Sequence, residues 1–219
     1  MNSKQALSPI IKPKFIRGIE DTCTRAIEIE DESSIRDIYI SDCKVDRQAA
    51  DQISFEGVIF NKVDFKGARF NSLELTDVRF ENCDLSNANF SGAIIHRTEF
   101  IDCKLVGMNL SEATLQNIYM KNCNGKFAVM SFIRMKNAVF SDCMFENSNF
   151  QSSIFNKVEV RKCNFRLSQM SGTSLSGIDL TDSDVEGLGI RPEDLRGAIV
   201  SPMQAIDFSK LLGLVIKAS

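Results

Sequence analysis

The chain has 219 residues, which is enough to bury a sizeable core, and its 26 basic residues nearly balance 29 acidic ones, leaving a formal net charge of −3. This balance excludes a strongly basic nucleic-acid-binding domain, so direct nucleic-acid binding is not expected. No apolar run approaches the roughly 20 residues of a membrane-spanning helix, and the N-terminus lacks an apolar run of signal-peptide length. We therefore expect one cytoplasmic domain with reduced cysteines and no membrane partner.

Residues 1–32 carry no regular repeat. Glu20, Arg25 and Glu30 stand where the repeat described below would need apolar side chains. The segment AIEIE (residues 26–30) alternates apolar and charged positions like an edge strand. We expect an irregular N-terminal cap over residues 1–32 that contains one short strand.

A period of five governs residues 33–200. From Phe55 to Val200 every fifth residue is Phe, Leu, Ile, Met or Val, with Gly125 as the single exception. The residue two places earlier is small or modest in size, and the one two places later is often Gly, Asn or Asp, which tolerate a positive φ. This period fits neither an α-helix nor a flat strand, because in both the apolar residues would face several directions. Each pentapeptide is therefore predicted to form one short extended side followed by a corner.

The seven cysteines follow a longer period, because all of them lie at multiples of twenty residues from Cys23. Stacked thiols cannot surround a tetrahedral zinc ion, and the spacing between coils slightly exceeds the usual Cβ separation of a disulfide. We interpret these cysteines as small buried hydrophobes. Their spacing predicts four pentapeptides per turn, a square solenoid with coils about 4.8 Å apart. The core column comprises Cys43, Cys83, Cys103, Cys123, Cys143 and Cys163.

Pentapeptides such as CDLSN (residues 83–87), ANFSG (residues 88–92) and IDLTD (residues 178–182) resemble the repeats of the pentapeptide-repeat family. The resemblance implies an all-β fold, a right-handed quadrilateral β-helix over residues 33–200. The sequence from Leu188 onward resembles the tail of fluoroquinolone-resistance members of the Qnr and MfpA type. That likeness implies a homodimer formed through the C-terminus, and a rod that imitates duplex DNA and binds type II topoisomerases such as DNA gyrase.

Gly125 interrupts the repeat. A glycine at a core position leaves a void that costs several kcal/mol by the precedent of large-to-small substitutions. Phe127 is the nearest candidate to fill it, and its side chain can reach the core only through a local bulge. We therefore expect a kink or bulge near Gly125.

Residues 201–219 predict a short capping helix and a tail. Ser201 can cap the helix, Pro202 suits its first position, Gln204 completes a capping box and Gly213 ends it. The tail is too apolar to stand free in water. It either lies back on the last coil or, as we favour, forms a two-fold dimer contact. The candidate dimer contact comprises Leu214, Val215 and Ile216.

No constellation of residues indicates an enzyme, a cofactor or a metal site. The single histidine, His96, follows a core position and is expected to point outward. The sequence has no phosphate-binding loop and no Cys-x-x-Cys motif. The expected role is therefore non-enzymatic and carried by the surface.

Charges are segregated along the predicted rod. Residues 33–112 hold thirteen acidic and nine basic residues, and residues 179–196 hold six and two. Residues 113–178, which we call the basic belt, hold three acidic and eight basic residues. The candidate partner surface in this belt comprises Tyr119, Arg134, Lys136, Lys157, Arg161, Lys162 and Arg166.

Apolar residues also stand at outward positions of the basic belt. Either several of them fold inward around Gly125, or they form a patch for an acidic partner or nucleic acid. The residues concerned are Tyr119, Phe127, Val129, Phe132, Val139 and Met144.

Two functions therefore compete. The resemblance favours a DNA mimic that binds type II topoisomerase and affects quinolone susceptibility. The alternative is a rigid scaffold that binds another protein through the basic, partly apolar belt. A broken acidic stripe and a register that leaves no room for projecting loops count against a full resistance-type role.

Overall fold

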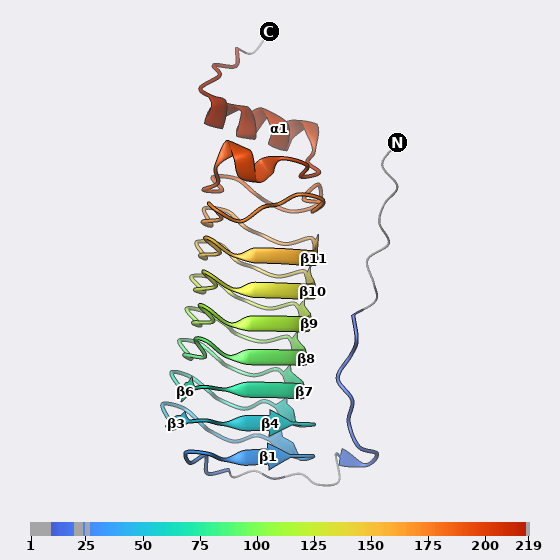
Figure 1. Ribbon diagram of the computed structural model, residues 1–219, viewed down its shortest axis with the longest axis vertical. Coiled ribbons are helices and arrows are strands. Elements are labelled where there is room, and N and C mark those ends of the chain that lie inside the picture. Colours follow the sequence, from blue (N-terminus) through green and yellow to red (C-terminus); the bar gives the residue numbers. More distant parts are fainter. Residues whose placement is uncertain (1–9, 20–23, 25–26, 218–219) are drawn as a thin grey trace.

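The computed structural model describes residues 10–19, 24 and 27–217, and it is a four-sided parallel β-solenoid with one short α-helix near the C-terminus (Figure 1). The coils stack along one axis into a rod, and the helix lies across the end of the stack. The fold expected from the repeat is thus confirmed. None of the described helices is long and apolar enough to cross a membrane.

Short strands open the solenoid and longer ones continue it. The short strands are β1 (Ser34–Arg36), β2 (Tyr39–Ser41), β3 (Ala49–Asp51), β4 (Ser54–Glu56), β5 (Ile59–Asn61) and β6 (Arg69–Asn71). The eight-residue strands are β7 (Glu74–Glu81), β8 (Ile94–Ile101), β9 (Thr114–Lys121), β10 (Arg134–Ser141) and β11 (Ile154–Arg161). Each long strand pairs in parallel with the next at an offset of twenty residues. The chain ends with the 3₁₀-helix η2 (Pro192–Leu195), α1 (Pro202–Ser209) and the 3₁₀-helix η3 (Lys210–Leu212).

Each turn has four faces, which we number by their central core residues. Face 1 is centred on Ile35 and every twentieth residue after it, face 2 on Ile40, face 3 on Val45 and face 4 on Ala50. The long strands span faces 1 and 2, whereas faces 3 and 4 are joined between coils mostly by isolated bridges, apart from the short pair β3 and β6 on face 4. On face 3 these bridges run without a gap from residue 44 to residue 184, a distance of about 34 Å at the spacing of parallel strands.

The sequence explains why faces 3 and 4 carry bridges instead of long strands. On these faces the residue before the core centre is often Asn or Asp, whose side-chain oxygen can accept the N–H two residues further on. Ser86 N–H donates to Asp84 Oδ1 over 3.0 Å, and Ser111 N–H donates to Asn109 Oδ1 over 2.9 Å. Such bonds hold the backbone in a turn and shorten the extended part of each side.

The corners lie where the repeat predicts them. Every fifth residue from Asp37 to Gly177, always two places after a core centre, has a positive φ. The preference for Gly, Asn and Asp at this position follows, because these residues enter the left-handed region at the lowest cost. The run is unbroken, and it includes Phe127 (60°) and Phe132 (59°).

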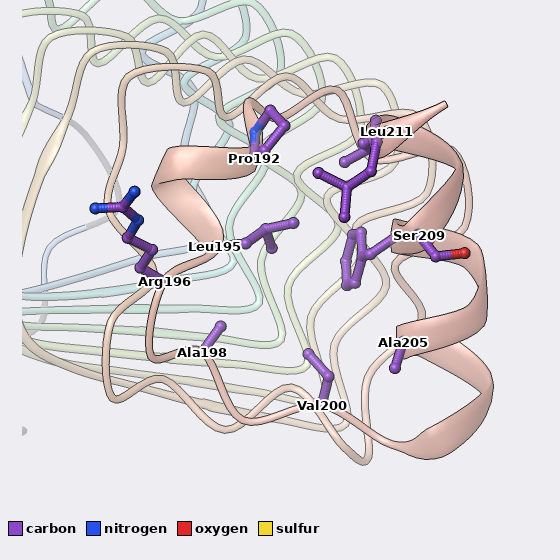
Figure 2. A pocket seen from close by; sticks show the side chains of 10 residues that line it. Pro192, Leu195, Arg196, Ala198, Val200, Ala205, Ser209 and Leu211 are labelled. Atoms are coloured by element: carbon purple, nitrogen blue, oxygen red, sulfur yellow. The ribbon is translucent and has the colours of Figure 1, made fainter. Parts of the chain in front are cut away.

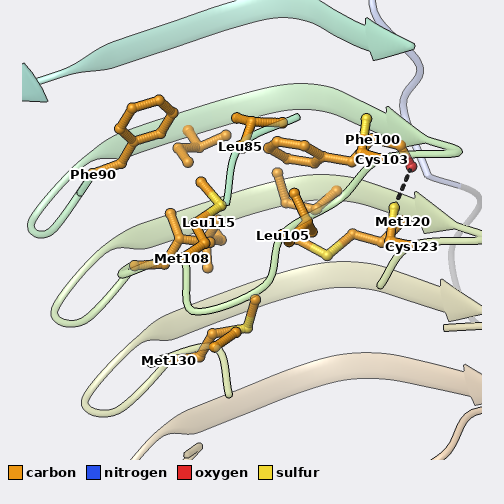
Figure 3. Packing of buried hydrophobic residues seen from close by; sticks show 14 of the residues in the cluster. Leu85, Phe90, Phe100, Cys103, Leu105, Met108, Leu115, Met120, Cys123 and Met130 are labelled. Carbon is orange, nitrogen blue, oxygen red and sulfur yellow. Dashed lines mark hydrogen bonds between the residues drawn. The ribbon is translucent and has the colours of Figure 1, made fainter. Parts of the chain in front are cut away.

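The core consists of stacked side chains inside the rod (Figure 3). On face 2 the rings of Phe60, Phe80 and Phe100 stack at centroid distances of 5.0 Å. The six cysteines of the core column are buried and free of disulfides. From Cys83 onward their thiols donate to backbone carbonyls, as from Cys123 Sγ to Phe100 O over 3.3 Å. The interpretation of these cysteines as core residues is confirmed; Cys23 lies outside the described residues.

The expectation of a kink or bulge at Gly125 is wrong. Gly125 N–H donates to Met144 O over 2.7 Å, so the ladder between coils continues. Phe127 does not enter the core, and 57% of its surface is exposed. The ring of Phe145, from the next coil, occupies the space instead: a β carbon built on Gly125 would lie 2.5 Å from Phe145 Cε1. Because the filling residue stands twenty positions away, no local distortion is needed.

The two ends of the rod are built differently. At the N-terminal end, residues 10–17 run alongside the coils (Figure 1), and Thr24 bridges to Ile40. The short strand expected within residues 26–30 is not formed by residues 27–30, while residues 25 and 26 lie outside the described part. At the C-terminal end, the predicted capping box of Ser201 and Gln204 is confirmed, and Gly213 follows η3 in the left-handed conformation.

Candidate interaction surfaces

The described residues contain no group of three or more His, Cys, Asp or Glu side chains that could hold a metal ion. His96 is half-buried beside Arg97, whose Nη1 lies 3.0 Å from His96 Nδ1. Asn117 Nδ2 lies 3.3 Å from His96 Nε2. Burial and the neighbouring guanidinium lower the pKa of His96, so it is neutral at physiological pH. His96 is therefore a neutral member of a polar cluster.

The thiols of the core column are buried and are not expected to be reactive. Burial raises the pKa of Cys43, and the hydrogen bond with Cys143 together with burial raises that of Cys163. The hydrogen bond with Cys123 raises the pKa of Cys143 to about 12, and bonds with Cys103 and Cys143 lower that of Cys123. Because reactivity also requires access to the thiolate, these shifts do not create a reactive cysteine.

The structure divides the candidate partner surface of the basic belt among three faces. Arg134 and Lys136 lie on face 1, and Lys157 lies at the corner between faces 1 and 2. Tyr119 and Arg161 lie on face 2, whereas Lys162 lies at the next corner and Arg166 lies on face 3. The sequence therefore predicted one surface where the fold presents several.

Carboxylates neutralise part of the belt. Arg161 pairs with Glu159, and Arg166 pairs with Glu186. Lys126 Nζ lies 2.6 Å from Glu146 Oε2. Among the described residues, Arg134 and Lys136 on face 1 form no ion pair, so both positive charges on this face remain available.

The structure leaves three of the six apolar residues of the belt exposed and encloses the other three at least in part. The exposed fractions are 57% for Phe127, 60% for Phe132 and 41% for Met144. Val139 is buried, and Tyr119 and Val129 are half-buried. Phe132 lies at the corner between faces 4 and 1, next to exposed Ile154 and Arg134 on face 1. Basic and apolar groups thus meet along one edge of face 1.

A cluster that the sequence analysis missed lies where β7 and β8 bend between faces 1 and 2. Arg97 makes two hydrogen bonds of 2.6 Å to the Asp77 carboxylate, and Arg79 Nε lies 2.8 Å from Glu99 Oε2. Glu99 is only 4% exposed. Both pairs join residues twenty apart, so opposite charges at that spacing were the signal that could have revealed them. We call Asp77, Arg79, Arg97 and Glu99 the β7–β8 corner.

The N-terminal segment contacts this corner. The backbone N–H of Lys14 donates to Asp77 Oδ1 over 2.9 Å, and the guanidinium of Arg79 lies 5.3 Å from the ring centroid of Phe15. Burial raises the pKa of Asp77, but the hydrogen bonds from Arg97 and from the Lys14 amide outweigh it and hold that pKa below its usual range.

A second exposed apolar region lies at the C-terminal end. A pocket of about 320 Å³ opens between the last coil and α1 (Figure 2), lined among others by Leu195, Val200, Phe208 and Leu211. None of the residues of α1 is buried, although Phe208 packs against the core. The exposed fractions of the predicted dimer contact are 56% for Leu214, 87% for Val215 and 50% for Ile216. The alternative in which this tail lies back on the last coil is therefore wrong.

Comparisons with known proteins agree with the repeat. A model described as "Pentapeptide repeat region" matches residues 73–140, and one described as "Pentapeptide repeats (8 copies)" matches residues 143–182. Over these residues the chain therefore matches the repeats of the pentapeptide-repeat family, and neither match indicates a catalytic family. Both matches end before residue 183, so the resemblance of the tail to resistance-type members is not confirmed.

A curated relative and two solved structures are also similar to this chain. The protein YisX of Bacillus subtilis, described as uncharacterized, is 52% identical over 126 residues, which are 58% of this chain and 59% of that protein. A trypsin-treated form of QnrB1, described as a plasmid-mediated fluoroquinolone resistance protein, is 20% identical over 90% of this chain and all of that chain, with a TM-score of 0.49. HetL from Nostoc sp. strain PCC 7120, described as involved in heterocyst differentiation regulation, is 16% identical over 77% of this chain and 85% of that chain, with a TM-score of 0.45.

Proposed function

We propose that this protein is a non-enzymatic rod that binds a DNA-binding protein, a type II topoisomerase such as DNA gyrase, in place of DNA. The observation that carries the proposal is the acidic surplus on faces 1 and 2 of the N-terminal half of an unbroken rod. Between residues 34 and 101 these faces present six carboxylates and three guanidinium groups, a net charge of −3. The carboxylates belong to Asp37, Glu56, Glu74, Asp77, Glu81 and Glu99, and the guanidinium groups to Arg36, Arg79 and Arg97.

Ion pairs neutralise half of these six carboxylates, so only a small acidic surface remains on faces 1 and 2. Each of the three arginines pairs with a carboxylate, as Arg36 does with Glu56 over 3.4 Å. Asp37, Glu74 and Glu81 form no ion pair among the described residues. Duplex DNA carries one charge per about 1.7 Å of its axis, so a DNA segment as long as this rod is far more acidic. The proposed mimicry therefore rests on rod shape and a local acidic contact.

The test is a gyrase supercoiling assay with the purified protein, with and without a quinolone. We expect inhibition of supercoiling or a change in quinolone sensitivity at micromolar protein. Glu74→Lys with Glu81→Lys should weaken the effect, because both changes reverse charge on the acidic side. Ser91→Lys with Ser111→Lys adds the same number of lysines on face 4 and serves as the matched control. An assay that wild-type protein leaves unchanged in every condition would overturn the proposal.

A second candidate function is supported by the edge of face 1. There Phe132 and Ile154 are each 60% exposed beside Arg134 and Lys136. Exposed aromatic and basic groups suit an acidic protein partner with an apolar pocket. Under this alternative Phe132→Ser with Arg134→Ser abolishes partner binding and leaves the supercoiling assay unaffected.

We also propose that the protein forms a two-fold dimer through its C-terminal end. The pocket under α1 and the exposed Leu214, Val215 and Ile216 give one surface both a hollow and an apolar segment. A two-fold contact suits such a surface, because each copy can insert its tail into the other. Sedimentation equilibrium should give a dimer for the wild type and a monomer for Val215→Asp. A monomeric wild type would contradict this proposal.

A further inference from the structure

Residues 10–17, which we call the N-terminal strap, form an extended segment with one side turned to the rod. Pro13 and Phe15 are half-buried, whereas Lys12, Lys14 and Ile16 are exposed. Pro13 fixes its own φ and lacks an N–H, and it restricts Lys12 before it to extended conformations. The strap runs along the rod (Figure 1) and so crosses the coils instead of adding a strand to them.

Two different contacts hold the strap at the β7–β8 corner. One is the hydrogen bond of 2.9 Å from the Lys14 N–H to Asp77 Oδ1, and the other is the approach of Arg79 to the Phe15 ring at 5.3 Å. The hydrogen bond to Asp77 involves only the backbone of the bound segment, so it does not depend on the side chain at that position. The contact with Arg79 requires an aromatic ring one residue later. The side chains of Asp77 and Arg79, which contact the strap, are held by hydrogen bonds within the rod. Arg97 orients Asp77, and Glu99 orients Arg79. The corner is therefore a preorganised receptor for an extended, aromatic-containing peptide.

The charges of strap and rod are complementary. Residues 10–17 contain Lys12, Lys14 and Arg17 and no acidic residue, so the strap carries a charge of +3. The faces on which it lies carry a net −3 between residues 34 and 101. A docked strap therefore offsets the acidic surplus that a basic partner would recognise.

We propose that the β7–β8 corner is a docking site for a basic, extended segment of a partner protein, and that the N-terminal strap occupies this site as a built-in competitor. Displacing the strap uncovers the acidic side of the rod. The regulatory part of this inference rests on the proposed function, whereas the docking of the strap does not.

The docking can be measured in the full-length chain because the sequence contains no tryptophan. Phe15→Trp introduces a single tryptophan at the corner. Adding Lys14→Pro deletes the N–H that donates to Asp77 while the segment stays extended. We expect Lys14→Pro to raise the accessibility of the introduced indole to iodide quenching, and Ile11→Ala, at a 52% exposed residue, to leave it unchanged. Equal quenching in all three proteins would overturn the docking.

Competition tests the receptor. A fluorescein-labelled peptide IIKPKFIR, the sequence of the strap, is titrated with wild-type protein and with the Lys14→Pro/Phe15→Ala variant. A strap docked nine-tenths of the time lowers the apparent affinity about ten-fold, so at that docked fraction the variant should bind the peptide about ten-fold more tightly. The peptide IIKPPAIR, with one lysine and the ring removed, should not bind the variant. Equal binding to wild type and variant, or no binding to either, would overturn the proposal.

The supercoiling assay separates this inference from the proposed function. If both hold, the Lys14→Pro/Phe15→Ala variant acts on gyrase at lower concentration than the wild type. If the peptide experiments give the expected results and gyrase is unaffected by either protein, the topoisomerase proposal fails and the docking site stands. A circular dichroism spectrum identical to that of the wild type shows that the variant keeps the solenoid.

Discussion

The ring of Phe145 fills the space that a side chain at Gly125 would occupy, with Phe145 Cε1 only 2.5 Å from the position of a β carbon on Gly125. The two residues stand at the same position of successive coils on face 3. Phe145 is fully buried, and its ring lies between Phe140, Phe150 and Phe165. The absence of a side chain at Gly125 therefore makes room for the ring of Phe145, and the two residues together fill this part of the core.

A double-mutant cycle should reveal this coupling. Gly125→Ala should destabilise the protein by about 1–3 kcal/mol, because the added methyl overpacks against a ring that cannot move aside. Phe145→Leu alone should destabilise it by leaving a cavity. Together the two changes nearly conserve volume, so the double variant should lose less stability than the sum of the single variants. Urea unfolding measures all three, and strict additivity would contradict the coupling.

The core column makes a simpler prediction. Cys103→Val should give a folded protein within about 1.5 kcal/mol of the wild type, because valine is an apolar residue of similar size and already stands in this column at Val63. Thermal unfolding and metal analysis of the purified protein check it. Loss of fold together with loss of a bound metal would show that the column is a metal site after all.

The side-chain amide of Gln204 anchors α1 through both its oxygen and its nitrogen. Gln204 Oε1 accepts from Ser201 N–H over 2.8 Å, and Gln204 Nε2 donates to Leu180 O and to Ser183 O, each over 2.8 Å. Gln204→Glu keeps the capping acceptor but loses both donors, so it should destabilise the docked helix by about 1–3 kcal/mol. Hydrogen exchange of the α1 amides measures the effect. Lys210→Ala, which removes an exposed ion pair, is the control and should change exchange little.

The sequence was sufficient for the architecture because its signals repeat. Core centres recur every five residues and cysteines every twenty, so both the corners and the number of sides could be predicted. The compensation at Gly125 was missed because Phe145 is a neighbour only after the chain has made a full turn. The contact of Lys14 with Asp77 joins residues 63 apart through a backbone N–H, and no side-chain pattern encodes such a bond.

Phe127 stands at a corner that costs it conformational energy. Its φ is 60°, and the next residue in the same corner column, Asn147, has a φ of 58°. Asparagine enters this region more readily than a bulky side chain, so Phe127→Asn should stabilise the protein by about 0.5–1 kcal/mol. The reciprocal change Asn147→Phe should destabilise it by a similar amount. Urea unfolding of both variants measures these changes in the free energy of unfolding. A Phe127→Asn variant less stable than the wild type would show that the ring packs more favourably than its 57% exposure indicates.

The strap should respond to acid in a narrow window. Hydrogen bonds from Arg97 and the Lys14 amide outweigh burial and hold the pKa of Asp77 below its usual value of about 3.9. A lowered pKa in the docked state means that the carboxylate contributes stability at all pH values above about 4, and that this contribution is lost as the pH falls through the lowered value. His96, the neighbouring titratable group, has a pKa below its usual range and so adds no transition near pH 7.

The fluorescence of the Phe15→Trp protein should therefore be constant between about pH 7 and pH 8 and change below about pH 4. Asp77→Asn keeps a side chain that tolerates the φ of 56° at this corner and removes the titrating group. In that background the acid transition should disappear while the solenoid stays folded. A transition centred near pH 6 to 7 in the wild-type background would instead assign the response to His96, and an unchanged acid transition in Asp77→Asn would assign it to another carboxylate.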